Sequence, residues 1–195
     1  MQNLALMPRF LGALFYYSPA TRTVRDLLAA FSSGDWETFY DWPEPQEIRA
    51  LCADMQEPDD YAFSVLFEGQ GKMEAPPWGS VYLDKDNLLM GNSAVSYRRF
   101  LQQHGLALAS DINEPEDQFG LMLLALAALL EAENTAAAHI LLEQHLLPWG
   151  YRYLDLLKAN RVSAFYARLA RLTEIFLRDM QEKAWLKPSE PRLWF

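Results

Sequence analysis

The sequence has little of what several common classes of protein require. Cys52 is the single cysteine among 195 residues, so no disulfide can form within the chain, and we expect a reducing compartment. Basic residues number 17 against 26 acidic residues, and the net charge of −9 disfavours binding to nucleic acid or to an anionic membrane surface. The same charge suits a basic partner, although solubility alone also explains it.

Long hydrophobic runs are lacking too. The longest uncharged apolar run, residues 119–130, is too short to cross a bilayer. The apolar stretch 1–15 has Arg9 in its middle, and it lacks both a basic start and an Ala-x-Ala-like cleavage site. We therefore interpret it as part of the fold and not as a signal peptide.

Patterns that hold a metal, a phosphate or a catalytic group are missing as well. The three histidines match no zinc-binding pattern, and no G-x-x-x-x-G-K-[ST] phosphate loop occurs. Ser80 and Ser93 have no identifiable base partner, so serine-type catalysis has no support. We predict a protein without catalytic residues, metal or cofactor. These serines and the carboxylates at 114–117 are the only features that favour an enzyme.

What the sequence does contain is helical periodicity. Apolar residues recur at the spacing of one helix face in four segments: 24–31, 48–55, 149–156 and 165–176. Cys52 lies on the second of these stripes and is interpreted as a small buried hydrophobe. Glu174 and Arg178 form an i,i+4 pair that we place on the outer side of the last helix. After Lys187 we predict irregular chain, with the apolar residues 193–195 docked on the body.

Prolines and capping residues predict where the helices begin. Ser18 and Pro19 are interpreted as the cap and first residue of one helix, and Pro115 as the start of a strongly apolar central helix. Residues 81–83 are interpreted as a short extended piece, but no long alternating strand occurs. We therefore expect an all-α fold in which one compact domain, residues 1–195, consists of many short helices around a buried central helix.

Two irregular segments remain of interest, and the first is the loop 76–80. Pro76 and Pro77 hold the backbone extended, so that Trp78 is presented with little conformational entropy left to lose. Gly79 allows another backbone to come close. The loop is interpreted either as an aromatic platform for an apolar peptide or as a place where tryptophan covers the core.

The second is the acidic segment 113–120. Pro115, with Glu116 and Asp117 in the first helical turn, is typical of a helix start, because carboxylates favour the positive end of the helix dipole. Carboxylates at the mouth of a buried helix are also suited to receive an arginine from a partner. A shielded, charge-assisted pair of this kind contributes about 1.5–3 kcal/mol.

Both segments resemble motifs of the TorD/DmsD family of chaperones. Residues 114–120 look like its E-P-x-D-H motif, and residues 145–149 look like its H-L-x-P-W element. Residues 76–84 are similar to the P-P-W-G-S-V-W-L-D stretch of the DmsD branch, whose first helix and G-D-S turn match residues 10–17 and 91–93. The similarity covers nearly the whole chain from about residue 10, in order and without large gaps.

The resemblance implies an all-helical, cytoplasmic chaperone, not an enzyme. Such a chaperone binds the twin-arginine leader of a molybdopterin-containing reductase of the DMSO/TMAO type and holds the precursor for cofactor loading before Tat export. Tat translocon components are further candidate partners. The expected peptide-binding residues are Pro77, Trp78, Gly79, Tyr82, Gly91, Glu114, Pro115, Asp117 and Gln118. We expect the proline-tryptophan loop and the acidic segment to lie side by side and to form an open peptide receptor.

One position departs from the family pattern, because Gln118 stands where the motif has histidine. Glutamine forms hydrogen bonds but does not titrate, so a protonated role at this position is not expected here. The guanine-nucleotide binding linked to some relatives is not expected either, since no phosphate loop is present. The alternative function is a helical adaptor or structural subunit with a permanent protein partner, which the aromatic content of 13% and the pair Trp194 and Phe195 favour.

Overall fold

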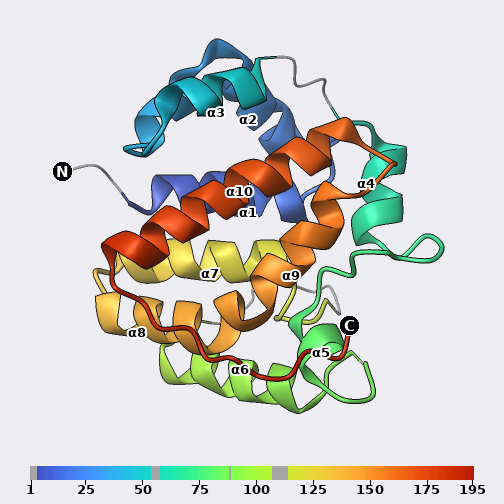
Figure 1. Ribbon diagram of the computed structural model, residues 1–195, viewed down its shortest axis with the longest axis vertical. Helices are drawn as coiled ribbons and strands as arrows, with labels where there is room; N and C mark the ends of the chain where they lie inside the picture. Colours follow the sequence, from blue (N-terminus) through green and yellow to red (C-terminus); the bar gives the residue numbers. More distant parts are fainter. Residues whose placement is uncertain (1–3, 54–57, 88, 107–113) are drawn as a thin grey trace.

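The computed structural model describes residues 4–53, 58–87, 89–106 and 114–195, and its regular structure is helical (Figure 1). Within these ranges no strand is present, so the prediction of an all-α single compact domain is confirmed. The elements in chain order are α1 (Leu6–Tyr16), α2 (Arg22–Ser33), the 3₁₀ helix η1 (Asp35–Phe39), α3 (Pro45–Cys52), α4 (Asp60–Phe67), α5 (Gly79–Leu83), α6 (Asn92–Gln103), α7 (Phe119–Glu131), α8 (Thr135–Ile140), the π-helical η2 (Leu141–Leu146), α9 (Leu147–Lys158) and α10 (Ala164–Lys183).

Helix α7 lies at the centre, as predicted, because its sequence is apolar nearly all round. Helix α1 packs along it, and two glycines allow the close approach. A Cβ atom on Gly12 would lie 2.8 Å from the carbonyl oxygen of Gly120, and a Cβ atom on Gly120 would lie 2.8 Å from the carbonyl oxygen of Gly12. The two backbones therefore meet at a point that admits no side chain on either helix.

Helix α2 begins at Arg22, so the predicted start at Ser18 and Pro19 was wrong. The side chain of Thr21 is the cap instead, since its Oγ1 accepts a hydrogen bond from the backbone N–H of Val24 at 3.3 Å. Ser18 belongs to the preceding turn, where its carbonyl oxygen accepts from the N–H of Thr21 at 2.9 Å.

Residues 81–83, predicted to be extended, are helical and belong to α5. The N–H of Val81 donates to the carbonyl oxygen of Trp78 at 3.2 Å, and the N–H of Asp84 donates to that of Ser80 at 3.1 Å. Helical hydrogen bonds therefore override the extended preference of this short apolar piece. The turn places α5 directly after the proline-tryptophan loop.

Helix α7 begins at Phe119, so the predicted start at Pro115 and the helical first turn containing Glu116 and Asp117 were also wrong. Gln118 is the cap, because its Oε1 accepts from the N–H of Leu121 at 2.9 Å. The acidic residues lie before the helix in irregular chain. Glu114 and Asp117 are held there by contacts with the proline-tryptophan loop, and Glu116 by Arg98 of α6.

Helices α8, η2 and α9 form one continuous helical run, although separate helices were predicted at 135–146 and from Pro148 onward. Pro148 has no N–H to donate to the carbonyl group four residues earlier, which disfavours regular α-helical bonding at this point. The chain accommodates the change with the π-helical segment η2.

Helix α10 buries the predicted stripe at 165–176, but Glu174 does not lie on the outer side. Glu174 is 5% exposed. Its carboxylate accepts hydrogen bonds from Lys158 Nζ at 2.5 Å, Arg178 Nε at 2.9 Å and Arg171 Nη1 at 3.1 Å. Burial favours the neutral form, but the hydrogen bonds from these three cations outweigh it and lower the pKa of Glu174 to about 2. The carboxylate therefore joins α10 to α9.

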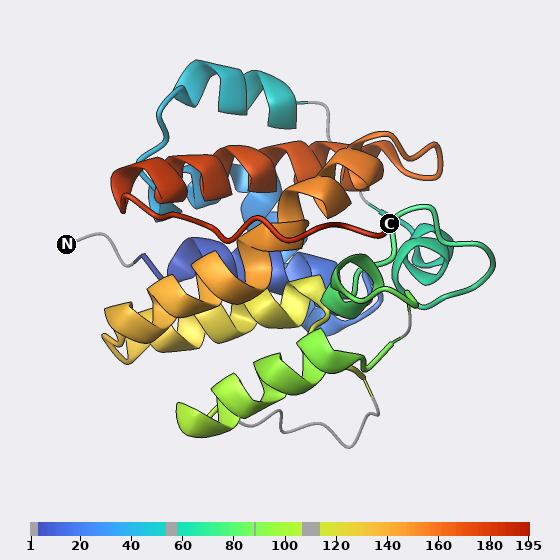
Figure 2. The ribbon, with the colours of Figure 1, turned by 60° about the horizontal axis from the view of Figure 1, so that its bottom comes forward.

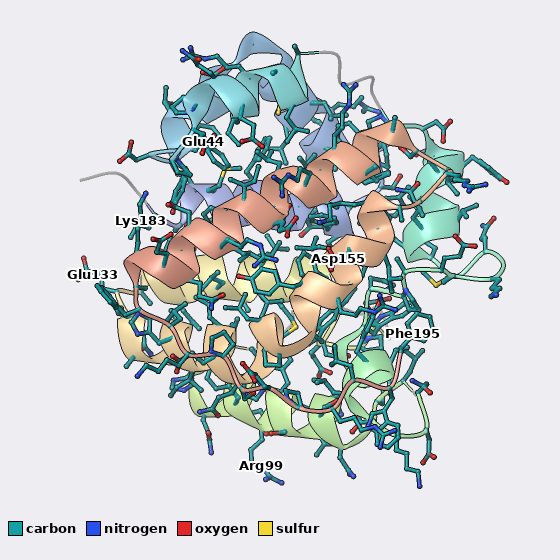
Figure 3. The ribbon with its side chains drawn as sticks, viewed as in Figure 1. Glu44, Arg99, Glu133, Asp155, Lys183 and Phe195 are labelled. Atoms are coloured by element: carbon teal, nitrogen blue, oxygen red, sulfur yellow. The ribbon has the colours of Figure 1, made fainter. Side chains whose placement is uncertain are left out.

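The segment 187–195 is irregular and docked, as predicted. Figure 1 shows that it runs from the end of α10 toward α5, and Figure 2 shows it crossing α9 on the way. The N–H of Trp194 donates to the carbonyl oxygen of Tyr82 at 2.9 Å, and Phe195 lies beside α5 (Figure 3). None of the described helices combines the length and the apolar character needed to cross a bilayer.

Candidate peptide-binding site

The proline-tryptophan loop and the acidic segment lie side by side, as expected. The N–H of Gly79 donates to the carbonyl oxygen of Asp117 at 3.1 Å, and the N–H of Phe119 donates to that of Pro77 at 2.8 Å. These bonds enclose an antiparallel bridge between Trp78 and Gln118. Two segments some forty residues apart in the sequence are therefore fixed to one another through their backbones.

Trp78 is half-buried and packs against the core, while its indole is oriented by an acidic residue. The indole Nε1 donates to Oε1 of Glu114 at 2.6 Å. The ring thus covers part of the core, as one interpretation predicted, and it is partly accessible beside a carboxylate. Its use as a platform for an apolar peptide stays a prediction. A half-exposed aromatic ring with a fixed orientation is suited to an apolar partner.

Burial strongly affects the carboxyl group of Glu114. It raises the pKa of Glu114, and the negative charges of Asp117 and Glu68 raise the pKa further, against the effect of the hydrogen bond from Trp78. A cation placed here would relieve the repulsion among the three carboxylates. The site is therefore electrostatically suited to an arginine or lysine side chain.

Asp117 of the acidic segment is 3% exposed, and its side chain contacts the proline-tryptophan loop. Its Oδ2 accepts a hydrogen bond from the N–H of Ser80 at 2.6 Å, whereas its Oδ1 is buried with no hydrogen-bond partner among the described residues. Burial raises the pKa of Asp117 although the Ser80 N–H stabilises the charged form. One oxygen of this carboxylate thus orders the start of α5, and the Ser80 side chain also stabilises the charged form of the group.

Glu116 is already paired within the chain. Its two carboxylate oxygens accept from Arg98 Nε at 2.6 Å and Arg98 Nη2 at 2.7 Å, and these hydrogen bonds lower the pKa of Glu116 despite its partial burial. Of the carboxylates in the acidic segment, Glu114 and Asp117 are therefore the better candidates to receive a cation from a partner.

Other predicted site residues lie behind this surface. Gln118 is 3% exposed, and in addition to capping α7 its Nε2 donates to the carbonyl oxygen of Phe15 at 3.2 Å. It therefore joins the end of α1 to the start of α7. Tyr82 is fully buried and stacks on Trp149 with the ring centroids 5.2 Å apart. Pro77 and Pro115 are buried as well.

The two predicted glycines leave room for neighbouring side chains. A Cβ atom on Gly79 would lie 2.8 Å from Nε1 of Trp149, and a Cβ atom on Gly91 would lie 2.3 Å from Oδ2 of Asp84. The Asp84 carboxylate needs that space, because it accepts hydrogen bonds from the N–H and the hydroxyl group of Ser93 at the start of α6. Gly79 thus leaves room for Trp149 in the lining of the site, and Gly91 leaves room for Asp84.

A pocket of about 280 Å³ opens next to Asp117. Sequence reasoning did not assign most of its lining, although three lining residues, His145, Pro148 and Trp149, belong to the H-L-x-P-W element. Burial lowers the pKa of His145 to about 4, so this imidazole is neutral at pH 7. The lining comes from α5, α6, the start of α7, η2, α9 and the segment 187–195: Gly79, Leu83, Ser93, Ser96, Tyr97, Asp117, Met122, Gln144, His145, Pro148, Trp149, Ser189 and Pro191.

Comparison with known proteins identifies the family of this chain. A family model described as nitrate reductase delta subunit matches residues 46–155, more than half of the chain. A protein of Haemophilus influenzae named as a probable Tat proofreading chaperone DmsD is 39% identical over 189 residues, which cover 93% of this chain and 91% of that protein. The chain belongs to the TorD/DmsD family. The DmsD protein of Salmonella typhimurium is 36% identical, with 92% of this chain and 89% of the relative covered.

The TorD chaperone of Aliivibrio salmonicida is a more distant relative, 29% identical over 126 residues that cover 59% of each chain. The comparisons confirm the resemblance drawn from the motifs. As a member of the TorD/DmsD family, whose matching relatives are named as chaperones, the protein is a chaperone and not an enzyme.

Proposed function

We propose that this TorD/DmsD protein binds the twin-arginine leader of a molybdopterin-containing reductase of the DMSO/TMAO type in the cytoplasm. It holds the precursor there while the cofactor is loaded, before Tat export, and Tat translocon components are further candidate partners. Three of its relatives are named as Tat proofreading chaperones or probable ones. A leader of this kind offers a basic start followed by an apolar stretch, so its receptor needs carboxylates beside an aromatic surface.

The observation that carries the proposal is the joint placement of Trp78, Glu114 and Asp117. Trp78 offers a half-buried ring that Glu114 holds in place, and Asp117 has a buried oxygen with no partner in the described part of the chain. The net charge of −9 favours encounter with a basic leader. Since the precursor must also be released, we expect a dissociation constant near 1 μM, about −8 kcal/mol.

Titration of a fluorescently labelled twin-arginine leader tests this function. Trp78→Ala is expected to weaken binding about thirtyfold, because a central aromatic anchor contributes about 2 kcal/mol or more. Trp185→Ala is the matched control, since it also removes an indole, but from a side chain that is 87% exposed and outside the site. Equal affinities for the two variants, or no saturable binding to any candidate leader, would contradict the proposal.

A helical adaptor with a permanent protein partner is the second candidate function. The observation that favours it is the same exposed Trp185. This residue lies in the turn after α10 and has a left-handed backbone conformation, with φ of 54°. Purification of the chain from cytoplasm distinguishes the two functions. The adaptor function would be favoured by a co-purifying partner that lacks an export leader and that no longer co-purifies with the Trp185→Ala variant.

A further inference from the structure

The segment 187–195 covers a surface beside the candidate site that includes Glu143 and Tyr82, and we call this surface the groove. It crosses α9 (Figure 2), and its residues Ser189 and Pro191 line the same pocket as Asp117. Leu186, just before the segment, is buried and fixes its start. The groove therefore already holds an extended chain, which indicates the kind of ligand that fits it.

Backbone hydrogen bonds hold the segment in the groove. The N–H of Lys187 donates to Oε1 of Glu143 at 2.5 Å, and the N–H of Ser189 donates to the carbonyl oxygen of Glu143 at 2.9 Å. At the far end, the N–H of Trp194 donates to the carbonyl oxygen of Tyr82 at 2.9 Å. These acceptors bind main-chain N–H groups and place no demand on the side chains of the segment, so another extended peptide can satisfy them.

The side chains of the segment repeat the chemistry expected of the leader. Arg192 is followed by three apolar residues, Leu193, Trp194 and Phe195, which is the same order of basic and then apolar groups. Leu193 packs partly buried against the core, and the Phe195 ring lies 5.4 Å from that of Tyr82. The segment thus places its apolar residues against Tyr82, which we predicted to bind peptide, while Arg192 stacks on the ring of Trp194.

The segment is also weakly anchored by its side chains. Of its nine residues only Pro188 and Leu193 are partly buried, and the rest are exposed, including Trp194 at 36% and Phe195 at 39%. If the segment left the groove, the carbonyl oxygen of the buried Tyr82 would lose the hydrogen bond from Trp194. Since an unpaired buried carbonyl group costs free energy, a second peptide that supplies an N–H group is favoured over an empty groove.

We propose that the segment 187–195 is an internal pseudo-ligand, and that the apolar part of the bound leader displaces it and forms main-chain hydrogen bonds with Tyr82 and Glu143. This inference rests on the proposed leader binding. It adds that the ligand binds as an extended chain and that the free protein occupies its own groove. Because the docked segment reduces the fraction of protein that is competent to bind, loosening the segment should tighten leader binding.

Two substitutions of one residue test the displacement. Trp194→Pro removes the N–H group that binds Tyr82, whereas the matched control Trp194→Ala removes the same indole and keeps that N–H group. Trp194→Pro is expected to bind the labelled leader about fivefold more tightly than Trp194→Ala. Equal or weaker binding by Trp194→Pro would overturn the proposal, because the segment would then be a fixed wall of the site.

Hydrogen exchange of the unaltered protein supplies an independent readout. Addition of the leader is expected to speed exchange at the amides of Ser189 and Trp194, whose hydrogen bonds the leader replaces. Unchanged or slower exchange at both amides, with the leader bound, would overturn the pseudo-ligand and leave the chaperone function intact. Failure of the leader to bind the unaltered protein and both Trp194 variants would overturn the proposed function as well.

Discussion

Replacing Glu174 with glutamine should destabilise the protein more than the loss of any exposed ion pair. The Glu174 carboxylate is 5% exposed and is bound by Lys158, Arg171 and Arg178. A pKa lowered from 4.5 to about 2 corresponds to roughly 3 kcal/mol of preference for the charged form in the folded state. Solvent screens the exposed arginines in part, so we expect Glu174→Gln to cost about 2–3 kcal/mol at pH 7.

The pH dependence of this loss has a defined sign. Because folding lowers the pKa of Glu174, its contribution is complete above about pH 4.5, the ordinary pKa, and is lost as the pH falls toward 2. The difference in unfolding free energy between the unaltered protein and Glu174→Gln should therefore be constant from pH 7 to pH 5. It should shrink progressively below pH 4.5.

Urea denaturation across this pH range measures the effect, and at pH 7 the melting temperature should fall by about 5–10 °C. Glu131→Gln is the matched control, since it removes a carboxylate that pairs with Arg9 where both side chains are more than 40% exposed. That change should cost about 0–1 kcal/mol. If the two variants lose the same stability, or if the loss at Glu174 persists undiminished at pH 3, the reasoning from burial and charge is wrong.

Three further predictions concern the packing at Gly12, the thiol group of Cys52 and the charge of Glu114. Gly12→Ala should destabilise the fold by about 1–3 kcal/mol in thermal unfolding, because the new Cβ atom would lie 2.8 Å from the Gly120 carbonyl oxygen; an unchanged melting temperature would contradict this contact. Burial raises the pKa of the Cys52 thiol to about 12, so iodoacetamide should alkylate it slowly at pH 8 until the protein unfolds. Rapid labelling of the folded protein, detected by mass spectrometry, would refute this. Leader affinity should fall as the pH decreases through the raised pKa of Glu114, since protonation removes the charge that attracts an arginine. Fluorescence anisotropy measures this affinity, and a value independent of pH between 7 and 4 would exclude that role of Glu114.

The parts of the fold that local pattern determines could be predicted from the sequence. The stripe at 165–176 is buried along α10, and the apolar run of α7 lies at the centre, because a helix with such a face must cover it with other elements. The adjacency of the proline-tryptophan loop and the acidic segment was also expected correctly. That expectation rested on the family resemblance, since no local pattern links residues so far apart.

Contacts between distant residues account for what the sequence could not predict. Pro115 with two following carboxylates fits a helix start, yet backbone bonds to Pro77 and Gly79 delay the helix until Phe119. The i,i+4 spacing showed only one of the three cations around Glu174, because Arg171 lies three residues before it on the same helix and Lys158 comes from another helix. The lining of the pocket next to Asp117 combines six elements, so most of its residues gave no signal beyond helical periodicity.

The central claim is that Glu114, held beside Trp78, receives the basic part of a leader, and a double-mutant cycle tests it most directly. Leader affinity is measured for the unaltered protein and Glu114→Gln, each with a leader carrying its arginine pair and a leader with glutamines in their place. We predict a coupling free energy of about 1.5–3 kcal/mol between Glu114 and the arginines. Effects that add to within about 0.5 kcal/mol would show that the arginines bind elsewhere and would contradict the account.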